Sequence, residues 1–406
     1  MTDQPSGPIQ RAHLGVSTLG HAISDGYVNF VPPLWHVVRS MFALTDASLG
    51  LVMMVFSLIT NFGQPVFGYF IDRRGWRNVV GLGVLVGAVG TCFVGFMPGI
   101  VAFTAMLVFS GVGTALFHPQ GGGAAAHASG ARRALGMSIF GMGGAVGYAM
   151  GALASPLLHS LGLRLGMGPL QGFIFALPVG LVLAWVLHSY SRSHQAPRQA
   201  VAFHLRQHLL PYWRSLLPVL GVMVLRSMTV VAYASFYQVI IGDRGLSELY
   251  QGVTLFFFVF GGAIGGVLGA QASDLYGRRF VTVTSLLLSP PLLLLSLSAD
   301  YWPAVVLLFL AGLTLRGAES VNIAQTQDMV PHGINMASSI GMGLAWGLAG
   351  IVTPIVGMVS DVTGNLPFAV ALTSGLPVVA AAVAMLLPSW PPGHPKATTA
   401  ARVEHP

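Results

Sequence analysis

Charged residues are scarce in this chain: only 8% of its 406 residues are Asp, Glu, Lys or Arg. A soluble domain carries about 25%, and 54% of the residues here are hydrophobic. No soluble fold of this length could hide so much apolar surface. The composition therefore predicts an all-α membrane protein that crosses the bilayer many times.

Cysteine is almost absent, since Cys92 is the only one and lies within an apolar run. This excludes an intramolecular disulfide and a metal site built on paired cysteines. The glycine-rich stretch 121–130 is not followed by Gly-Lys-Ser/Thr, so it is no phosphate-binding loop. An ATP-driven pump or a membrane enzyme is disfavoured, and we expect no cofactor, with protons as the coupling ion.

Apolar runs of roughly 20 residues, the length that a spanning helix needs, occur twelve times. The expected spans are 13–38, 47–71, 78–97, 99–121, 133–160, 168–189, 215–241, 249–272, 280–299, 302–324, 334–360 and 365–388. The first run is too long for the hydrophobic region of a signal peptide, so we expect it to be retained as a span.

One long polar interruption, from His188 to Arg214, separates six spans from six. We therefore expect an N-terminal half over 1–189, a cytoplasmic linker over 190–214, and a C-terminal half over 215–406 that ends in a short cytoplasmic tail. Because six is even, both halves keep the same orientation. This predicts two parallel, pseudo-symmetric six-helix halves around a site near the middle of the membrane.

Arginine and lysine gather in alternate loops. With the N-terminus inside, the inner loops and tails hold fourteen of them, whereas the outer loops hold only Arg39, Arg164 and Arg244. Positive residues favour the cytoplasmic side, so both termini are expected in the cytoplasm, at the inner membrane of a bacterium. These loops also account for the net charge of +7, which therefore does not indicate nucleic acid.

Two short loops repeat each other half a chain apart. In 68–77 and 270–279, Asp72 aligns with Asp274 and Gly75 with Gly277, at an offset of 202 residues. A carboxylate at a helix end can pair with an arginine of a neighbouring helix and hold one conformation closed. Alternatively, the arginines only anchor the topology. The expected latch residues are Gly68, Asp72, Arg73, Gly75, Arg77, Asp274, Gly277, Arg278 and Arg279.

These features together resemble the major facilitator superfamily. Twelve spans, a six-plus-six repeat, a long central loop and a G-x-x-x-D-R-x-G-R-R pattern after the second span carry the likeness, with Trp76 where the pattern prefers arginine. The segments 21–34, 111–126 and 131–151 are similar to the fosmidomycin-resistance group of efflux permeases, with H-x-x-x-D in the first helix and F-H-P ending the fourth. The resemblance implies export of a drug or metabolite, driven by proton entry.

Asp25 lies near the middle of the first span, and His21 lies one turn earlier on the same face. An ionised carboxylate there costs about 2.5–3.5 kcal/mol, so it should face a cavity or a partner. A carboxylate beside an imidazole can exchange protons near neutral pH. We interpret the pair as a proton-coupling or substrate site; a structural hydrogen bond is the alternative.

Arg226 lies in the seventh span, 201 residues after Asp25 (226 − 25), almost at the pseudo-symmetric position. The resemblance implies that helices 1, 4, 7 and 10 line the central cavity. The simplest prediction is an ion pair between Asp25 and Arg226 across it. Arg226 would then contact an anion or release the Asp25 proton; a static clamp between the halves is the alternative.

The tenth span carries a polar stripe. Arg316 and Glu319 are three residues apart and can pair on one face, and Asn322 continues the stripe. Glu319 follows His118, the histidine of the F-H-P segment, by 201 residues (319 − 118). Equivalent positions in the two halves thus hold one titratable residue each, which predicts a proton path. The alternatives are a salt bridge for Glu319 and a structural role for His118.

Two further features bear on function. Tyr27 and Tyr233 lie near Asp25 and Arg226 along their helices and are the aromatic residues expected at the substrate site. The fifth span places several glycines on one face, which lets a neighbouring helix approach and slide. The Gly-Pro pair that superfamily antiporters carry in this helix is missing, which weakens the antiporter interpretation.

The sequence thus predicts a monomeric secondary transporter that works by alternating access and exports a small organic molecule by proton antiport. Its expected partners are that substrate and the lipid bilayer, with no nucleic acid. One alternative is a proton-coupled importer of a small organic anion, with Arg226 as the anion contact. The other is a non-transporting membrane sensor, which should carry a large soluble domain that the sequence does not show.

Overall fold

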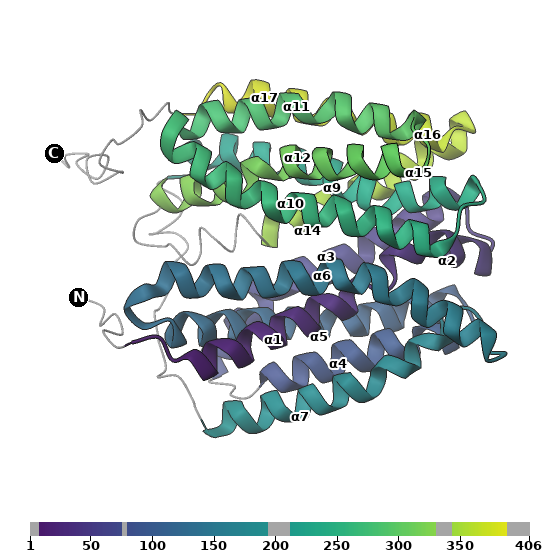
Figure 1. Cartoon of the computed structure of the whole chain (residues 1–406), viewed down its shortest axis with the longest axis horizontal. Coiled ribbons are helices and arrows are strands. Elements are labelled where there is room, and N and C mark those ends of the chain that lie inside the picture. Colours follow the sequence, from purple (N-terminus) through teal and green to yellow (C-terminus); the bar gives the residue numbers. More distant parts are fainter. Residues whose placement is uncertain (1–7, 75–78, 194–211, 330–342, 388–406) are drawn as a thin grey trace.

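The computed structural model describes residues 8–74, 79–193, 212–329 and 343–387. Every regular element among them is a helix, and Figure 1 shows the helices in two groups, α1 to α7 below and α9 to α17 above. The expected linker, 190–214, falls mostly outside the described residues, so the domain boundaries stay a prediction.

The helices of each half follow one another along the chain without strands between the described residues. The N-terminal half contains α1 (Arg11–Val28), η1 (Pro32–Leu34), α2 (Trp35–Met41), α3 (Asp46–Arg74), α4 (Val79–Phe93), η2 (Val94–Phe96), α5 (Ile100–Ala128), η3 (Gly130–Arg132), α6 (Arg133–Arg164), η4 (Gln171–Ala176) and α7 (Leu177–Ser193). The C-terminal half contains α9 (Trp213–Asp243), α10 (Glu248–Tyr276), α11 (Arg278–Ser298), α12 (Tyr301–Met329), α14 (Ala345–Ala349), α15 (Val352–Thr363), α16 (Leu366–Leu372), η7 (Thr373–Gly375) and α17 (Leu376–Ala384).

Eleven helical segments among the described residues are long and apolar enough to cross a membrane. They correspond to the second to twelfth expected spans, which confirms the all-α membrane fold. The first expected span, 13–38, is wrong as a single helix: α1 ends at Val28, and α2 begins at Trp35. Pro32 and Pro33 lie between the two helices. Proline removes a backbone donor and clashes with the preceding turn, so it interrupts the helix here.

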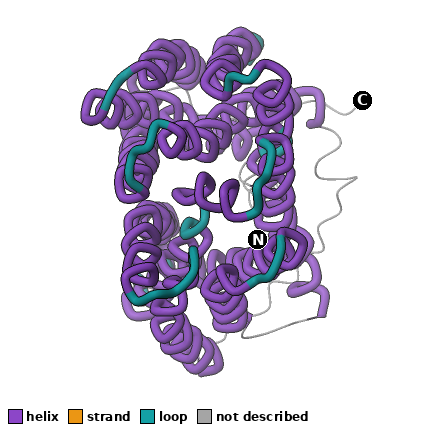
Figure 2. Tube along the Cα trace, turned by 90° about the vertical axis from the view of Figure 1, so that its right-hand side faces the viewer, coloured by secondary structure: helices purple, strands orange, loops and turns teal. Residues whose placement is uncertain are grey.

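The helices run between two ends of the molecule. α1 begins at the end where α7 and α17 finish, at the left of Figure 1, and we call this the tail end. Seen from the opposite, far end, the described chain is helix and connecting loop throughout (Figure 2). The sequence predicts that the tail end is cytoplasmic.

Small residues bring the two halves together toward the far end. A Cβ at Gly50 of α3 would overlap the backbone of Thr353 in α15, and the Thr353 hydroxyl donates to the Gly50 carbonyl at 2.8 Å. Likewise, a Cβ at Gly252 of α10 would overlap the carbonyl of Ala152 in α6. Helices that lack side chains at the contact can approach to backbone distance.

Charged side chains close the far end. Arg39 of α2 donates hydrogen bonds to Asp46, at the start of α3, and to Asp243, at the end of α9. Asp361 of α15 accepts from the backbone N–H groups of Asp46 and Ala47 at 3.0 and 3.1 Å. A carboxylate of one half therefore caps a helix of the other, where a helix N-terminus favours negative charge.

Candidate functional site: one charged cluster in each half

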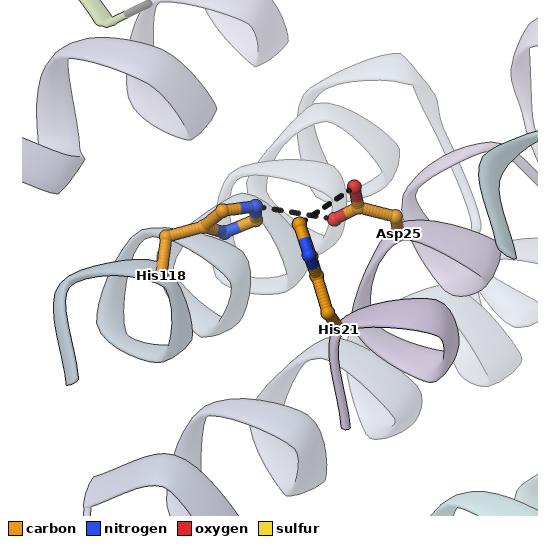
Figure 3. A group of neighbouring side chains, drawn as sticks. All are labelled: His21, Asp25 and His118. Carbon is orange, nitrogen blue, oxygen red and sulfur yellow. Dashed lines mark ion pairs between the residues drawn. The ribbon is translucent and has the colours of Figure 1, made fainter. Parts of the chain in front are cut away.

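The first cluster joins α1 to α5 within the N-terminal half. The carboxylate of Asp25 lies between two imidazoles, with Oδ2 3.3 Å from Nε2 of His21 and Oδ1 3.2 Å from Nε2 of His118 (Figure 3). The Asp25 and His118 side chains are each 19% exposed, so the cluster is mostly enclosed. The expected contact between His21 and Asp25 is confirmed, and His118 joins them from α5.

Both histidines are oriented by main-chain carbonyls. Nδ1 of His21 lies 2.8 Å from the carbonyl oxygen of Phe140 in α6, and Nδ1 of His118 lies 2.9 Å from that of Thr114 in its own helix. The His21 ring also stacks on the Phe140 ring, with centroids 4.2 Å apart. A Cβ at Gly144 would overlap the His21 ring, so the absence of a side chain there makes room for it.

The glycine face predicted for the fifth span explains how α6 comes so close to α1. At Gly147 an added Cβ would overlap the carbonyl of Ala22, and at Gly151 it would overlap that of Gly26. Gly144, Gly147 and Gly151 therefore share the face that contacts α1, one turn apart. Close approach along this face supplies the Phe140 carbonyl to His21.

The second cluster joins α9 to α12 within the C-terminal half. Nη2 of Arg226 lies 3.5 Å from Oε1 of Glu319, and Nε of Arg316 lies 2.6 Å from Oε2 of the same carboxylate. The predicted pair of Arg316 and Glu319 is thus confirmed. Two guanidinium groups share one carboxylate, which leaves this cluster with an excess positive charge.

Trp346 of α14 completes the second cluster. Its Nε1 donates to Oε1 of Glu319 at 3.1 Å, and its ring centroid lies 5.8 and 5.5 Å from the guanidinium carbons of Arg226 and Arg316. Arg226 is fully buried, yet its Nε and Nη1 have no hydrogen-bond partner among the described residues. Its charge is therefore stabilised by one carboxylate, one aromatic face and the Ser227 hydroxyl.

The predicted ion pair between Asp25 and Arg226 is wrong for this structure. Asp25 pairs with His21 and His118, whereas Arg226 pairs with Glu319. The repeat offset relates equivalent positions of the two halves but does not bring them into contact. Each half instead pairs its buried charged groups within itself, because an unpaired charge is costly in a low-dielectric interior.

Three further expected site residues form their hydrogen bonds outside these clusters. The Tyr27 hydroxyl donates to the Ala176 carbonyl at 2.7 Å, because Tyr27 follows Asp25 by two residues and so points to the other side of α1. The Tyr233 hydroxyl lies 2.8 Å from Ser374. Asn322 is fully buried and accepts from Thr282 of α11 at 3.1 Å. All three stabilise packing within their own half.

The latch motif is only partly described. The side chains of Asp72 and Arg73, and the residues Gly75 and Arg77, lie outside the described part of the chain, whereas an added Cβ at Gly68 would lie 3.4 Å from Pro119. In the second copy, Gly277 joins α10 to α11 at a positive φ of 88°, a conformation that favours glycine, and Arg278 begins α11. Asp274 is exposed and forms no ion pair with another described residue, and Nη2 of Arg279 lies 3.9 Å from the Met385 sulfur.

Two residues of the site were not selected from the sequence. Trp346 lies one span beyond Glu319 in the sequence, a separation that carries no spacing signal. Tyr148 of α6 interacts electrostatically with both Asp25 and Arg316. Its glycine-rich surroundings were the only signal available, and they indicate helix contact rather than a polar site.

The first cluster also has the composition of a metal site. The ligand atoms of His21, Asp25 and His118 lie within 4.8 Å of one another, and two imidazoles with one carboxylate suit a divalent transition metal. Hydrogen bonds from the outer ring nitrogens to carbonyls would orient such ligands. The same arrangement suits proton binding, and the expectation of no cofactor stays a prediction.

Comparisons with known proteins agree on one family. A model described as "Major Facilitator Superfamily" matches residues 14–241 and 219–405. The fosmidomycin resistance protein of Escherichia coli (strain K12) is 28% identical over 359 residues, which cover 86% of each chain. An uncharacterized MFS-type transporter of Bacillus subtilis (strain 168) is 28% identical over 378 residues, which cover 91% of each chain.

Solved structures show the same architecture. A bacterial homologue of the human lysosomal transporter Spinster, in an inward-facing and unoccupied conformation, matches with a TM-score of 0.69 at 16% identity, over 94% of this chain and 97% of its own. A point mutant of the nucleoside transporter NupG matches with a TM-score of 0.70 at 14% identity, over 92% of this chain and 99% of its own. At such low identity the likeness concerns the fold.

Proposed function

We propose that this chain, which belongs to the Major Facilitator Superfamily, is a secondary active transporter that exports a small organic molecule by proton antiport. It would lie in a bacterial inner membrane, with the tail end cytoplasmic. We further propose that it acts as a monomer, without a cofactor other than the coupling protons. The relationship to an Escherichia coli fosmidomycin resistance protein supports export as the direction.

The observation that carries this proposal is the position of Asp25 between two imidazoles. A carboxylate with imidazoles at 3.2 and 3.3 Å forms a cluster that can exchange protons near neutral pH, because imidazole changes its charge in that range. Asp25 lies on α1 and contacts His118 of α5, which are the first and fourth spans of the chain. The resemblance implies that both spans line the central cavity. Proton binding and substrate binding then exclude each other when both require the same carboxylate.

Alternating access would couple this competition for Asp25 to movement of the substrate across the membrane. Protons that arrive from the outer side occupy the Asp25 cluster, the halves rock, and substrate from the cytoplasm displaces the protons. The polar contacts of Arg39, Asp243 and Asp361 would hold the far end closed in one of the two states. Each step uses differential binding to the two conformations, which is the requirement for a ligand-driven transition.

The experiment is substrate-induced proton movement in everted membrane vesicles, with fosmidomycin as the first probe. Wild-type vesicles should acidify internally on energisation and lose that gradient when fosmidomycin is added. Asp25→Asn should abolish the response, and Asp300→Asn, at an exposed far-end position, should retain it. If Asp25→Asn keeps wild-type coupled transport, Asp25 is not the coupling residue and the proposal fails.

A second candidate is proton-coupled import of a small organic anion. It is favoured by the second cluster, where Arg226 and Arg316 share Glu319 and two nitrogens of Arg226 lack a partner among the described residues. An anionic group could bind there, and protonation of Glu319 would free the arginines for it. Accumulation in intact cells compared with everted vesicles distinguishes import from export, since the two preparations present opposite faces.

A further inference from the structure

The side chains of His21, Asp25 and His118 point toward one another from α1 and α5 (Figure 3). Nε2 of His21 lies 3.3 Å from one Asp25 oxygen, and Nε2 of His118 lies 3.2 Å from the other. One ligand atom from each of the three residues can be chosen so that all three lie within 4.8 Å of one another. Two imidazole nitrogens and a carboxylate therefore converge on a single point.

The hydrogen bonds on the outer side of each ring leave these nitrogens available as ligands. Nδ1 of His21 is bonded to the Phe140 carbonyl at 2.8 Å, and Nδ1 of His118 to the Thr114 carbonyl at 2.9 Å. A carbonyl oxygen only accepts hydrogen bonds, so each Nδ1 donates, and in a neutral ring Nε2 keeps a lone pair. Histidines that bind metal ions are commonly oriented in this way, by a carbonyl or carboxylate on the outer nitrogen.

The spacing fits a tetrahedral ion. Zn²⁺ binds imidazole nitrogen and carboxylate oxygen at about 2.0–2.2 Å, which places neighbouring ligand atoms of a tetrahedron about 3.4 Å apart. The two nitrogen–oxygen distances of 3.3 and 3.2 Å are close to that value. The two nitrogens would have to approach each other by at most about 1.4 Å (4.8 − 3.4).

The cluster is held in place and still accessible. The His21 ring stacks on Phe140 with centroids 4.2 Å apart, and it packs against Gly144, so one ligand is fixed before any ion arrives. The side chains of Asp25 and His118 are each 19% exposed. An ion can therefore reach the carboxylate and the second imidazole from that exposed side.

We propose that His21, Asp25 and His118 bind one divalent transition-metal ion of the Zn²⁺ class, with a fourth position left for water. Imidazole ligands disfavour Mg²⁺ and Ca²⁺, which prefer oxygen. The ion would join α1 to α5 and occupy the carboxylate that the proposed function assigns to proton and substrate exchange. It would thus inhibit transport, and this second part rests on the proposed function.

Binding is measured by titrating the tag-free, full-length protein in nanodiscs with ZnCl₂. We expect wild type to bind one Zn²⁺ in the cluster. Loss of a group that only orients a ligand weakens metal binding about 10–100-fold, so loss of a ligand in His21→Gln or His118→Gln should weaken it at least about 100-fold. His127→Gln, which removes a histidine at the end of α5, should bind as wild type does.

X-ray absorption spectroscopy of the wild-type protein identifies the ligands without any substitution. With one Zn²⁺ per chain, the spectrum should show two imidazoles, with nitrogen at about 2.0–2.1 Å. Three results would overturn the site. Wild type binds no Zn²⁺, both histidine variants bind it as tightly as wild type, or the spectrum shows fewer than two imidazoles.

Inhibition is tested separately, by fosmidomycin flux in proteoliposomes. Saturating Zn²⁺ should stop the flux of wild type and of His127→Gln, and a chelator should restore it. Unchanged flux with the site filled overturns the inhibition. Absence of flux before Zn²⁺ is added, together with normal Zn²⁺ binding, instead counts against the proposed function and leaves the metal site intact.

Discussion

Glu319 of α12 lies 3.5 Å from Arg226 of α9, and this ion pair has a counterpart in the N-terminal half. There, His118 of α5 lies 3.2 Å from Asp25 of α1. The offset is 201 residues for both members, 226 − 25 and 319 − 118. The repeat therefore keeps an interhelical ion pair while it exchanges the signs of the two charges.

Removing the acidic member should destabilise the C-terminal half. Glu319→Gln leaves Arg226 and Arg316 without a carboxylate, and an uncompensated buried charge costs about 3–5 kcal/mol. We expect a marked fall in the unfolding temperature of the purified protein. The double variant with Arg226→Gln should recover part of it, because it removes one of the unpaired charges.

Glu248→Gln is the matched control for this series. Glu248 begins α10 at the far end and forms no ion pair with another described residue, so its loss should change the unfolding temperature little. If the double variant is destabilised by the sum of the two single variants, Arg226 and Glu319 do not interact and the assignment of the pair is wrong.

Local spacing predicted contacts well in this chain, and repeat symmetry did not. The pairs His21 with Asp25 and Arg316 with Glu319 follow from separations of four and three residues on one helix, which fix the geometry. The partner of Arg226 depends instead on how α9 packs on α12, and nothing in the sequence near Arg226 encodes that packing. Positions that are equivalent in the repeat are therefore not in contact with each other.

The same distinction, between spacing along one helix and packing between helices, explains which contacts the aromatic residues make. Tyr27 is close to Asp25 in sequence but about 200° around the helix from it, so it binds Ala176 within its own half. Trp346 reaches Glu319 from another span, a contact that only tertiary structure creates. Long apolar runs, by contrast, predicted eleven of the helices, because a membrane imposes length and composition on each segment independently.

The glycine face of α6 gives a second prediction. Gly147→Ala should destabilise the protein, because its Cβ would overlap the Ala22 carbonyl, and overpacking of this kind costs about 1–3 kcal/mol. Gly141→Ala is the control, since its Cβ would contact no other helix among the described residues. Thermal unfolding should rank Gly147→Ala below wild type and Gly141→Ala at or above it. Equal effects would argue against the close approach of α1 and α6.

Trp346 gives a third prediction. Trp346→Phe keeps the aromatic ring but removes the donor to Glu319, so we expect a loss of about 1 kcal/mol in stability together with slower transport. Trp302→Phe, at a ring that is 66% exposed, should change neither. A wild-type unfolding temperature for Trp346→Phe would show that this hydrogen bond contributes nothing to the cluster.

Arg39 gives the last prediction, at the far end. It joins Asp46 of one half to Asp243 of the other, so Arg39→Ala removes this link and leaves both carboxylates without their arginine. A loss of about 1 kcal/mol shifts a two-state equilibrium about fivefold, here toward an open far end. Spin labels at the exposed Thr45 and Thr363, in a Cys92→Ser background, would report a larger population of long distances. Arg164→Ala, which removes an exposed far-end arginine, should leave the distribution unchanged; an identical distribution for Arg39→Ala would mean that the ion pair does not hold the halves together.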